Sequence, residues 1–152
     1  MANSQSLSTS FKVDLLNGLH AFGTTVVRGA TTKDSFKGAL YLASGSQGAA
    51  TTAYSATNEV SGTGYTATGT AVTNATAPTS TGTTAFWTPS ASLAWTTVTL
   101  ATAFDAVTIY NDTSAGKNAV GTFTFGSQTV TAGNFTLTMP ANDATNGLIR
   151  LA

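Results

Sequence analysis

The longest patterned stretch of the chain is Leu93–Asn111, in which apolar, aromatic and β-branched residues alternate with small polar ones. It contains two runs, Trp95–Leu100 and Phe104–Tyr110, separated by three small residues. Because such residues fit a pleated, half-buried surface, each run is predicted to be a strand. Both faces of the second run are largely apolar, which indicates a central strand covered on both sides. The expected faces are Phe104, Ala106, Thr108 and Tyr110 on one side, with Val107 and Ile109 on the other.

Shorter alternating runs elsewhere predict further strands, separated by turn-forming residues at intervals of about 8–12 residues. These strands are expected at Ser35–Ala43, Thr84–Pro89, Val120–Phe125, Phe135–Met139 and Gly147–Ala152, with short ones at Thr24–Arg28 and near Gly64–Val72. Turns are predicted at Asn111-Asp112, Gly126-Ser127-Gln128 and Ala132-Gly133-Asn134. The predicted core residues are Val107, Ile109, Phe135 and Leu137.

The beginning of the chain has a different pattern. Residues 1–10 form a polar arm, and Thr9 or Ser10 can cap a helix over Phe11–Asn17 that ends before Gly18. A helix of about two turns cannot stand alone in water, so it is expected to close one end of the domain or to contact a partner. The arm has little apolar surface, and we expect it to become ordered only against another chain.

Together these elements predict an all-β protein with a single antiparallel β-sandwich, jelly-roll-like, and one short N-terminal helix. The predicted organisation is an N-terminal arm over residues 1–10 and one domain over residues 11–152. No helical stretch separates the late strands, which argues against parallel βαβ units. The segment Ser44–Ala85 is rich in Gly, Ala, Ser and Thr. It is expected to pack against a neighbouring chain or to form a functional excursion, with disorder as the alternative.

Composition narrows the function classes. Only 8% of the 152 residues are charged, six basic against six acidic, whereas about 25% is typical. A balanced, sparsely charged chain lacks the electrostatic footprint of a nucleic-acid or anionic-membrane partner, so neither is expected. The chain has no cysteine, which excludes disulfides and thiolate-bound metals. With so few charges, electrostatic repulsion between copies of the chain is weak, which favours a protein that works within an assembly.

Candidate chemistry is sparse. His20 is the only histidine, and a structural role is the stronger interpretation. Gly62-Thr63-Gly64 resembles part of a phosphate loop but lacks the lysine and the strand-to-helix context. Asp112 and Asp143 lie in turn-like sequences, with Ca²⁺ binding as the remote alternative. An aromatic sugar-binding platform is one interpretation of Tyr54, Tyr65, Phe86 and Trp87, and packing in the core or at an interface is the stronger one. We assign no catalytic, cofactor-binding or metal-binding residue and expect no enzyme.

Targeting signals are equally sparse. No apolar run approaches the roughly 20 residues of a membrane span. Residues 1–10 lack the basic and apolar regions of a signal peptide, so synthesis in a cytoplasm is expected.

Several segments, in their order and spacing, resemble a family of small structural proteins of tailed bacteriophages. The likeness runs from about residue 11 to the end of the chain. The segments are Phe11–His20, Phe36–Tyr41, Gly48–Tyr54, Asn58–Ala67, Phe104–Asn111 and Asn146–Ala152. The resemblance implies a virion component, of which jelly-roll cement proteins on the outside of the capsid offer the nearest role. It carries over no catalytic or binding residues.

The expected function is therefore that of a capsid decoration, or cement, protein located on the virion surface. Its expected partners are the major capsid protein and other copies of itself, as a dimer or trimer. The alternative is a tail or head fibre component that contacts the host, with carbohydrate binding as one way in which it could do so. An enzyme is a distant third interpretation.

Overall fold

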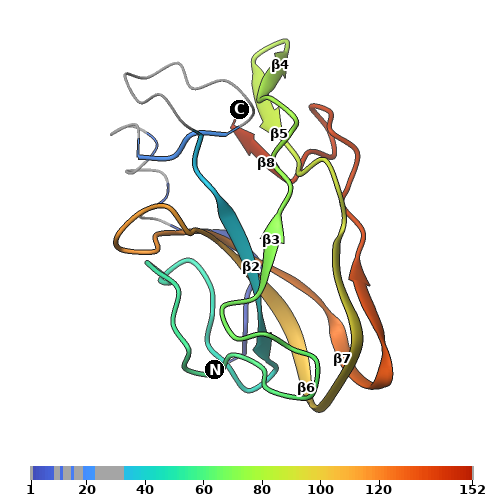
Figure 1. Cartoon of the computed structure of the whole chain (residues 1–152). Helices are drawn as coiled ribbons and strands as arrows, with labels where there is room; N and C mark the ends of the chain where they lie inside the picture. The colour runs from blue at the N-terminus through green and yellow to red at the C-terminus, as the bar shows by residue number, and fades with distance from the viewer. Residues whose placement is uncertain (1, 9–10, 12–14, 16–18, 23–32, 152) are drawn as a thin grey trace.

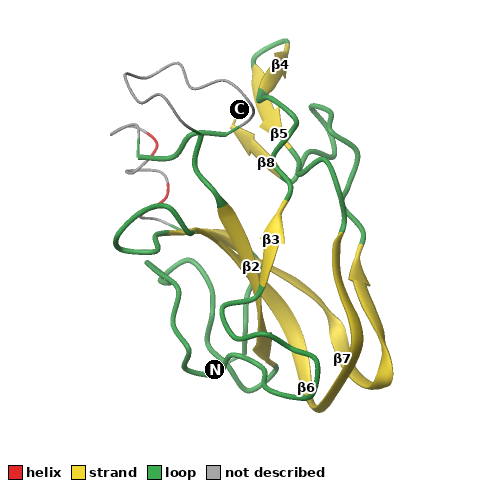
Figure 2. Cartoon of the chain, viewed as in Figure 1, coloured by secondary structure: helices red, strands yellow, loops and turns green. Residues whose placement is uncertain are grey.

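The computed structural model describes residues 2–8, 11, 15, 19–22 and 33–151. This part of the chain is mostly β structure arranged in antiparallel sheets, and no complete helix lies within it (Figures 1 and 2). No helix in the same residues is long and apolar enough to cross a membrane. The strands are β1 (Ser6–Leu7), β2 (Phe36–Leu42), β3 (Thr70–Val72), β4 (Thr79–Thr81), β5 (Thr84–Trp87), β6 (Leu93–Asn111), β7 (Ala119–Leu137) and β8 (Ile149–Leu151).

Two sheets organise these strands. The larger sheet has the order β1-β7-β6-β2-β3, and the smaller one has the order β4-β5-β8. The predicted strands near Ser35–Ala43, Thr84–Pro89 and Gly147–Ala152 are confirmed as β2, β5 and β8. The last strand pairs with β5, which ends two residues before Pro89 because proline cannot donate to a ladder.

The long hairpin formed by β6 and β7 doubles back on itself (Figure 1). Phe125 and Phe135 lie ten residues apart in β7, which would separate them by about 33 Å in a straight strand. Their ring centroids are 5.4 Å apart, so the strand must fold back between them. The same holds for β6, where the side chains of Leu93 and Val107 both reach the space in front of Gly38. The two halves of the hairpin therefore face each other.

Irregular pairing at the bend makes this doubling possible. Between Leu100 and Phe104 the chain of β6 advances four positions while β7 advances only from Val130 to Gln128. Such bulges bend a strand and increase its twist without ending it. Two non-glycine residues near the bend, Thr97 and Ala132, also have positive φ values of 54° and 46°.

These bulges correct two predictions. Leu93–Asn111 is one continuous strand with a bend and not two separate strands. The turns predicted at Gly126-Ser127-Gln128 and Ala132-Gly133-Asn134 lie inside β7, because glycine and small residues here serve bulges. By contrast, the turn after β6 is confirmed: Asn111 Oδ1 accepts hydrogen bonds from the backbone of Thr113 at 2.9 Å and Ser114 at 3.0 Å.

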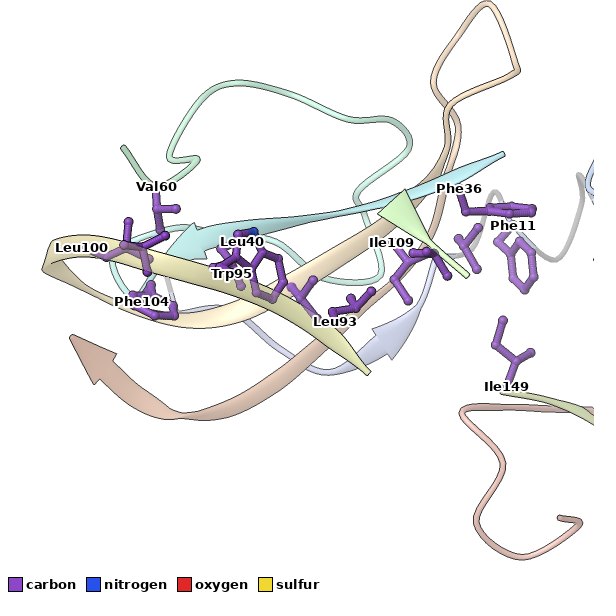
Figure 3. Packing of buried hydrophobic residues seen from close by; sticks show 14 of the residues in the cluster. Phe11, Phe36, Leu40, Val60, Leu93, Trp95, Leu100, Phe104, Ile109 and Ile149 are labelled. Carbon is purple, nitrogen blue, oxygen red and sulfur yellow. The ribbon is translucent and has the colours of Figure 1, made fainter. Parts of the chain in front are cut away.

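The main hydrophobic core lies between the facing halves of the hairpin and β2 (Figure 3). Val107 and Ile109 are buried, as predicted, whereas Phe135 and Leu137 are half-buried and pack against this core. Phe104 forms T-shaped contacts with Phe125 and Phe135, with centroid distances of 6.0 and 4.9 Å. Aromatic pairs of this geometry add about 0.5–1.5 kcal/mol each beyond burial of area.

A second, smaller cluster covers the opposite face of β2 and β6. It consists of Ala39, Tyr41, Ala106 and Tyr110, with Tyr54 packed against it. The prediction that β6 is covered on both sides is therefore confirmed. Phe104, however, belongs to the main core and not to the face of Tyr110, because the register shifts between Phe104 and Ala106.

The N-terminal arm corrects another prediction. Ser6 and Leu7 pair antiparallel with Thr122 and Gly121 of the same chain, so the arm does not require another chain for order. Asn3 anchors the first residues, because its side-chain amide donates to the Leu42 carbonyl at 2.9 Å and to Asp105 at 2.6 Å. Addition of a strand to a sheet edge satisfies the polar backbone that the arm cannot bury by itself.

Two predicted elements near the N-terminus lie largely or wholly outside the described residues. The helix over Phe11–Asn17 stays a prediction, although Phe11 itself is fully buried in the main core. The strand at Thr24–Arg28 lies outside the described part altogether.

Replacing Ile109 with alanine tests the placement of the central strand. Ile109 is 1% exposed and belongs to the main core. We expect Ile109→Ala to lower the free energy of unfolding by about 2–5 kcal/mol through lost burial and a residual cavity. Ser80→Ala, at an exposed position of β4, is the control and should stay within about 0.5 kcal/mol. Chemical denaturation measures both, and equal stability of the two variants would refute the assignment of Ile109 to the core.

Candidate functional site

A cluster of hydrogen-bonded polar side chains surrounds Glu59, the only glutamate in the chain. The hydroxyl of Tyr54 donates to Glu59 Oε2 at 2.6 Å, and the hydroxyl of Tyr65 donates to Oε1 at 2.8 Å. The backbone amide of Thr68 donates to the same Oε1 at 2.8 Å. Bonds to an ionised carboxylate are stronger than neutral ones, so these three contacts fasten residues 54–68 around a single side chain.

The remaining two tyrosines fasten this segment to the sheet. Tyr41 on β2 donates its hydroxyl to the Ser55 carbonyl at 2.7 Å. Tyr110 on β6 donates to the Thr68 carbonyl at 2.8 Å, and its ring contacts that of Tyr54 with centroids 4.9 Å apart. All four tyrosines of the chain thus take part, and we call them, together with Glu59, the tyrosine clamp.

The tyrosine clamp explains the Gly/Ala/Ser/Thr-rich segment. Within residues 44–69, Tyr54 packs on the second face of the sheet, and residues 58–60 pair alongside β2 through backbone bonds from Leu42 N to the Asn58 carbonyl and from Val60 N to the Leu40 carbonyl. Residues 44–69 are therefore ordered against their own sheet, so the alternative of disorder is wrong for this part, while packing against a neighbouring chain stays a prediction. Small residues let the segment approach the sheet closely, and the tyrosines supply the apolar cover that it lacks.

Burial of the phenols sets their acid–base behaviour. The pKa of Tyr41 is raised to about 12, chiefly by burial; its hydrogen bond to the Ser55 carbonyl lowers the pKa and the nearby Glu59 raises it, both by less. Burial likewise raises the pKa of Tyr110 to about 12. The pKa values of Tyr54 and Tyr65 are also raised, first by burial and then by their hydrogen bonds to Glu59. Near neutral pH the phenols stay protonated and act as hydrogen-bond donors.

The structure separates the residues of the aromatic platform considered from the sequence. Tyr54 and Tyr65 belong to the tyrosine clamp, whereas Phe86 and Trp87 are buried in β5 at 6% and 2% exposure. The Trp87 ring contacts Phe22 with centroids 4.8 Å apart, and its indole nitrogen donates to the Thr76 carbonyl at 2.9 Å. Of the two interpretations, core packing is the one confirmed.

His20 lies in a buried polar cluster at the end of β6. It is 7% exposed and its ring contacts Phe11 with centroids 5.0 Å apart. Asn111 Nδ2 lies 3.3 Å from His20 Nδ1 and donates to Asp34 Oδ2 at 2.9 Å, while the backbone of Ala21 donates to the same oxygen at 3.0 Å. These bonds tie the segment before β2 to the start of the turn after β6, which fits a structural role.

The turn aspartates also hold backbone in place. Asp112 pairs with Lys117 at 2.8 Å and Lys37 at 3.3 Å, and the hydrogen bond from Lys117, followed by Lys37, holds its pKa below the usual value. Asp143 accepts from the side chain and backbone of Asn146, which lowers its pKa too. Within the described residues, no three histidine, aspartate or glutamate side chains come together as a set of metal ligands.

The glycine-rich Gly62-Thr63-Gly64 segment packs against the sheet. Thr63 forms an isolated antiparallel bridge with Thr99 of β6, whose amide donates to the Thr63 carbonyl at 2.9 Å. A side chain on Gly62 would meet the Thr99 carbonyl oxygen at 2.0 Å. Close packing, and not the cradling of a phosphate, is therefore what these glycines serve here.

A groove runs along β7 where the arm, the middle of β7 and residues 137–150 meet. Its larger part has a volume of about 670 Å³, and a smaller hollow of about 230 Å³ adjoins it. Gln5, Phe123, Pro140 and Leu148 line both parts. The smaller hollow reaches the side chains of Val107 and Ile109, so here the core is accessible between the two halves of the hairpin. We call this feature the β7 groove.

Sequence reasoning found neither the tyrosine clamp nor the β7 groove. A single glutamate among four tyrosines in a nearly uncharged chain is the signal that could have indicated the clamp. No signal of that kind exists for the groove, because it depends on the doubling of the hairpin. Comparisons of the chain with protein families, with curated proteins and with solved structures found no match.

The tyrosine clamp predicts an abnormal alkaline titration. Because folding raises the four phenol pKa values, the stabilisation is complete below the unfolded value of about 10 and is lost as the pH rises through the folded values. Phenolate absorbance should stay low at pH 10 in the folded protein and appear together with unfolding. The control is the same titration in denaturant, which should be half complete near pH 10. Ionisation of a tyrosine near pH 10 with the fold intact would argue against the clamp.

A glycine series tests how closely residues 62–69 approach the sheet. Gly69 has a φ of 77°, and a side chain there would meet the Gly38 carbonyl oxygen at 2.0 Å. We expect Gly69→Ala to cost clearly more than the roughly 1–2 kcal/mol of backbone strain alone. Gly82 has a φ of 59° and no atom within 4 Å of an added side chain, so Gly82→Ala measures the backbone strain alone. Gly126 also faces open space and lacks a positive φ, so Gly126→Ala should be nearly neutral. Denaturation midpoints that rank otherwise would contradict this packing.

Proposed function

We propose that the chain is a capsid decoration protein of a tailed bacteriophage, which binds the outer surface of the shell and stabilises it. We also propose that its fold is a jelly-roll type of β-sandwich, in which the doubled hairpin supplies strands to both layers. The resemblance of six ordered segments to small phage structural proteins is the starting point. The support from the structure lies in how the chain uses its polar groups.

The acidic side chains of the described residues serve internal contacts. Glu59 holds the tyrosine clamp, and Asp105 holds the arm through Asn3. Asp34, Asp112 and Asp143 each fix a turn or a neighbouring segment. This observation carries the proposal, because it leaves a surface of small neutral side chains, which suits broad repeated contacts better than chemistry.

The exposed surface has the same character. Strand residues that face solvent are mainly Thr, Ser, Ala and Asn, and Leu151 is the only large apolar side chain that is exposed in the described part, at 43%. Such a surface can lie flat against a regular shell without the desolvation cost of buried charges. Each contact is then modest, and repetition over the shell provides the total binding free energy.

Stabilisation of the shell follows from mass action. A protein that binds the assembled shell, and not the free or unexpanded subunits, shifts the equilibrium towards the assembled state. At a free concentration of 100 times the dissociation constant, the shift is about 2.7 kcal/mol for each site. Summed over many sites, this would protect a shell against internal pressure.

The copy number in the virion separates this proposal from its alternatives. Quantitative mass spectrometry of purified particles should find the chain in numbers comparable to the capsid subunits. A few copies per particle would favour a tail or head fibre component that contacts the host, and absence from the particle would reject a virion role. Particles assembled without the chain should release DNA at a lower temperature, and adding back the purified protein should restore the original temperature.

A further inference from the structure

The outer edge of β7 has no strand partner over the second half of the strand. β1 pairs with β7 only at Gly121 and Thr122, and β6 pairs along the other side as far as Leu137. In the described residues nothing pairs with the outer side of Val130–Leu137. These eight residues exceed the five or six of an average strand, so the edge is long enough to bind another strand.

The same edge lacks the features that normally prevent association. Lysine, proline and inward-pointing charges are the usual means by which edge strands are protected. The whole of β7 has no charged residue and no proline. Thr131, Asn134 and Thr136 are exposed, and the half-buried Phe135 and Leu137 alternate with them. Only the bulge at Ala132 interrupts the edge.

The two halves of the hairpin also differ in how many neighbouring strands they have. The half that contains Phe104–Asn111 is extended by β2 and β3 on one side and by β1 on the other. The half that contains Val130–Leu137 has only β6 beside it, with the bridge at Thr63 beyond. A two-stranded ribbon is a marginal unit, and another strand at its free edge would complete it. That strand would also cover the hollow lined by Phe125, Leu137 and Met139.

We propose that the edge Val130–Leu137 pairs antiparallel with the same edge of a second copy of this chain. A two-fold axis makes such a pairing self-complementary, and an uncharged strand meets its own copy without like charges opposite each other. The chain has a formal net charge of zero, so the copies do not repel each other at long range. Cross-strand threonine pairs add favourable contacts.

The pairing that uses the whole segment fixes the position of the axis. Residues 131 and 132 form the bulge and together take one position of the ladder, so the axis lies at Asn134 and Thr131 of one copy faces Thr136 of the other. Asn134 is exposed, so a smaller side chain fits there, at the cost of the hydrogen bond that its Oδ1 accepts from Thr97 N at 2.9 Å. The proposal concerns the purified protein and does not depend on the virion role.

Single cysteines test the pairing, because the chain contains none of its own. Under mild oxidation Asn134→Cys should form a disulfide-linked dimer, since antiparallel neighbours at the axis lie within the roughly 4.4–6.8 Å Cα range of a disulfide. Thr131→Cys mixed with Thr136→Cys should give the mixed dimer in excess over either self-linked product. Ser80→Cys, on the exposed edge strand β4, is the control and should stay monomeric. Equal cross-linking of all positions would overturn the proposal.

A charge at the edge gives an independent measurement without cysteine. Sedimentation of the unmodified chain should show a monomer–dimer equilibrium, and Thr131→Lys should weaken the dimer by about tenfold or more. Ser80→Lys should leave the equilibrium unchanged, and circular dichroism should show that all variants keep the fold. A chain that stays monomeric at every concentration tested, or a dimer insensitive to Thr131→Lys, would reject pairing through β7. Either result would leave the shell-binding proposal open.

Discussion

The contact among Phe104, Phe125 and Phe135 is the constraint on which the rest of the structure depends. It joins the two halves of one hairpin across the core, with centroid distances of 4.9 to 6.0 Å. Without it the bend in β6 and β7 would have no partner surface, since bulges allow a strand to fold back but do not drive it. The main core, the β7 groove and the free edge of β7 all follow from that fold-back.

The tyrosine clamp stabilises the segment over residues 54–68 by hydrogen bonds, whereas the main core is held by apolar contacts. A segment of small residues buries too little apolar surface to hold its place, so its order has to come from elsewhere. Four phenols and one carboxylate supply it through directed hydrogen bonds around Glu59. One of the few charges of the chain is thus used to hold a covering segment in place.

The pattern of residues along the sequence predicted those features that depend on neighbouring residues. β-Branched alternation located β2, β5 and β8, the asparagine turn after β6 and the buried positions of Val107 and Ile109. It failed where the outcome depends on distant contacts: glycines inside β7 were interpreted as turns, because a bulge and a turn use the same residues. Phe104 was predicted on the same face as Tyr110, which was wrong because the register shifts between Phe104 and Ala106. The clamp joins residues up to 42 positions apart, which periodicity cannot detect.

The short turn between β6 and β7 has a consequence for how the chain finds this fold. Once Asn111 and Asn118 have paired, the two strands can zip outward from the turn, and each added pair closes only a small loop. The facing halves are then already tethered, so the contacts across the core cost far less chain entropy than their separation in sequence implies. A fold with many long-range contacts thereby gains a local route to its core, with the doubling of a preformed ribbon as the decisive step.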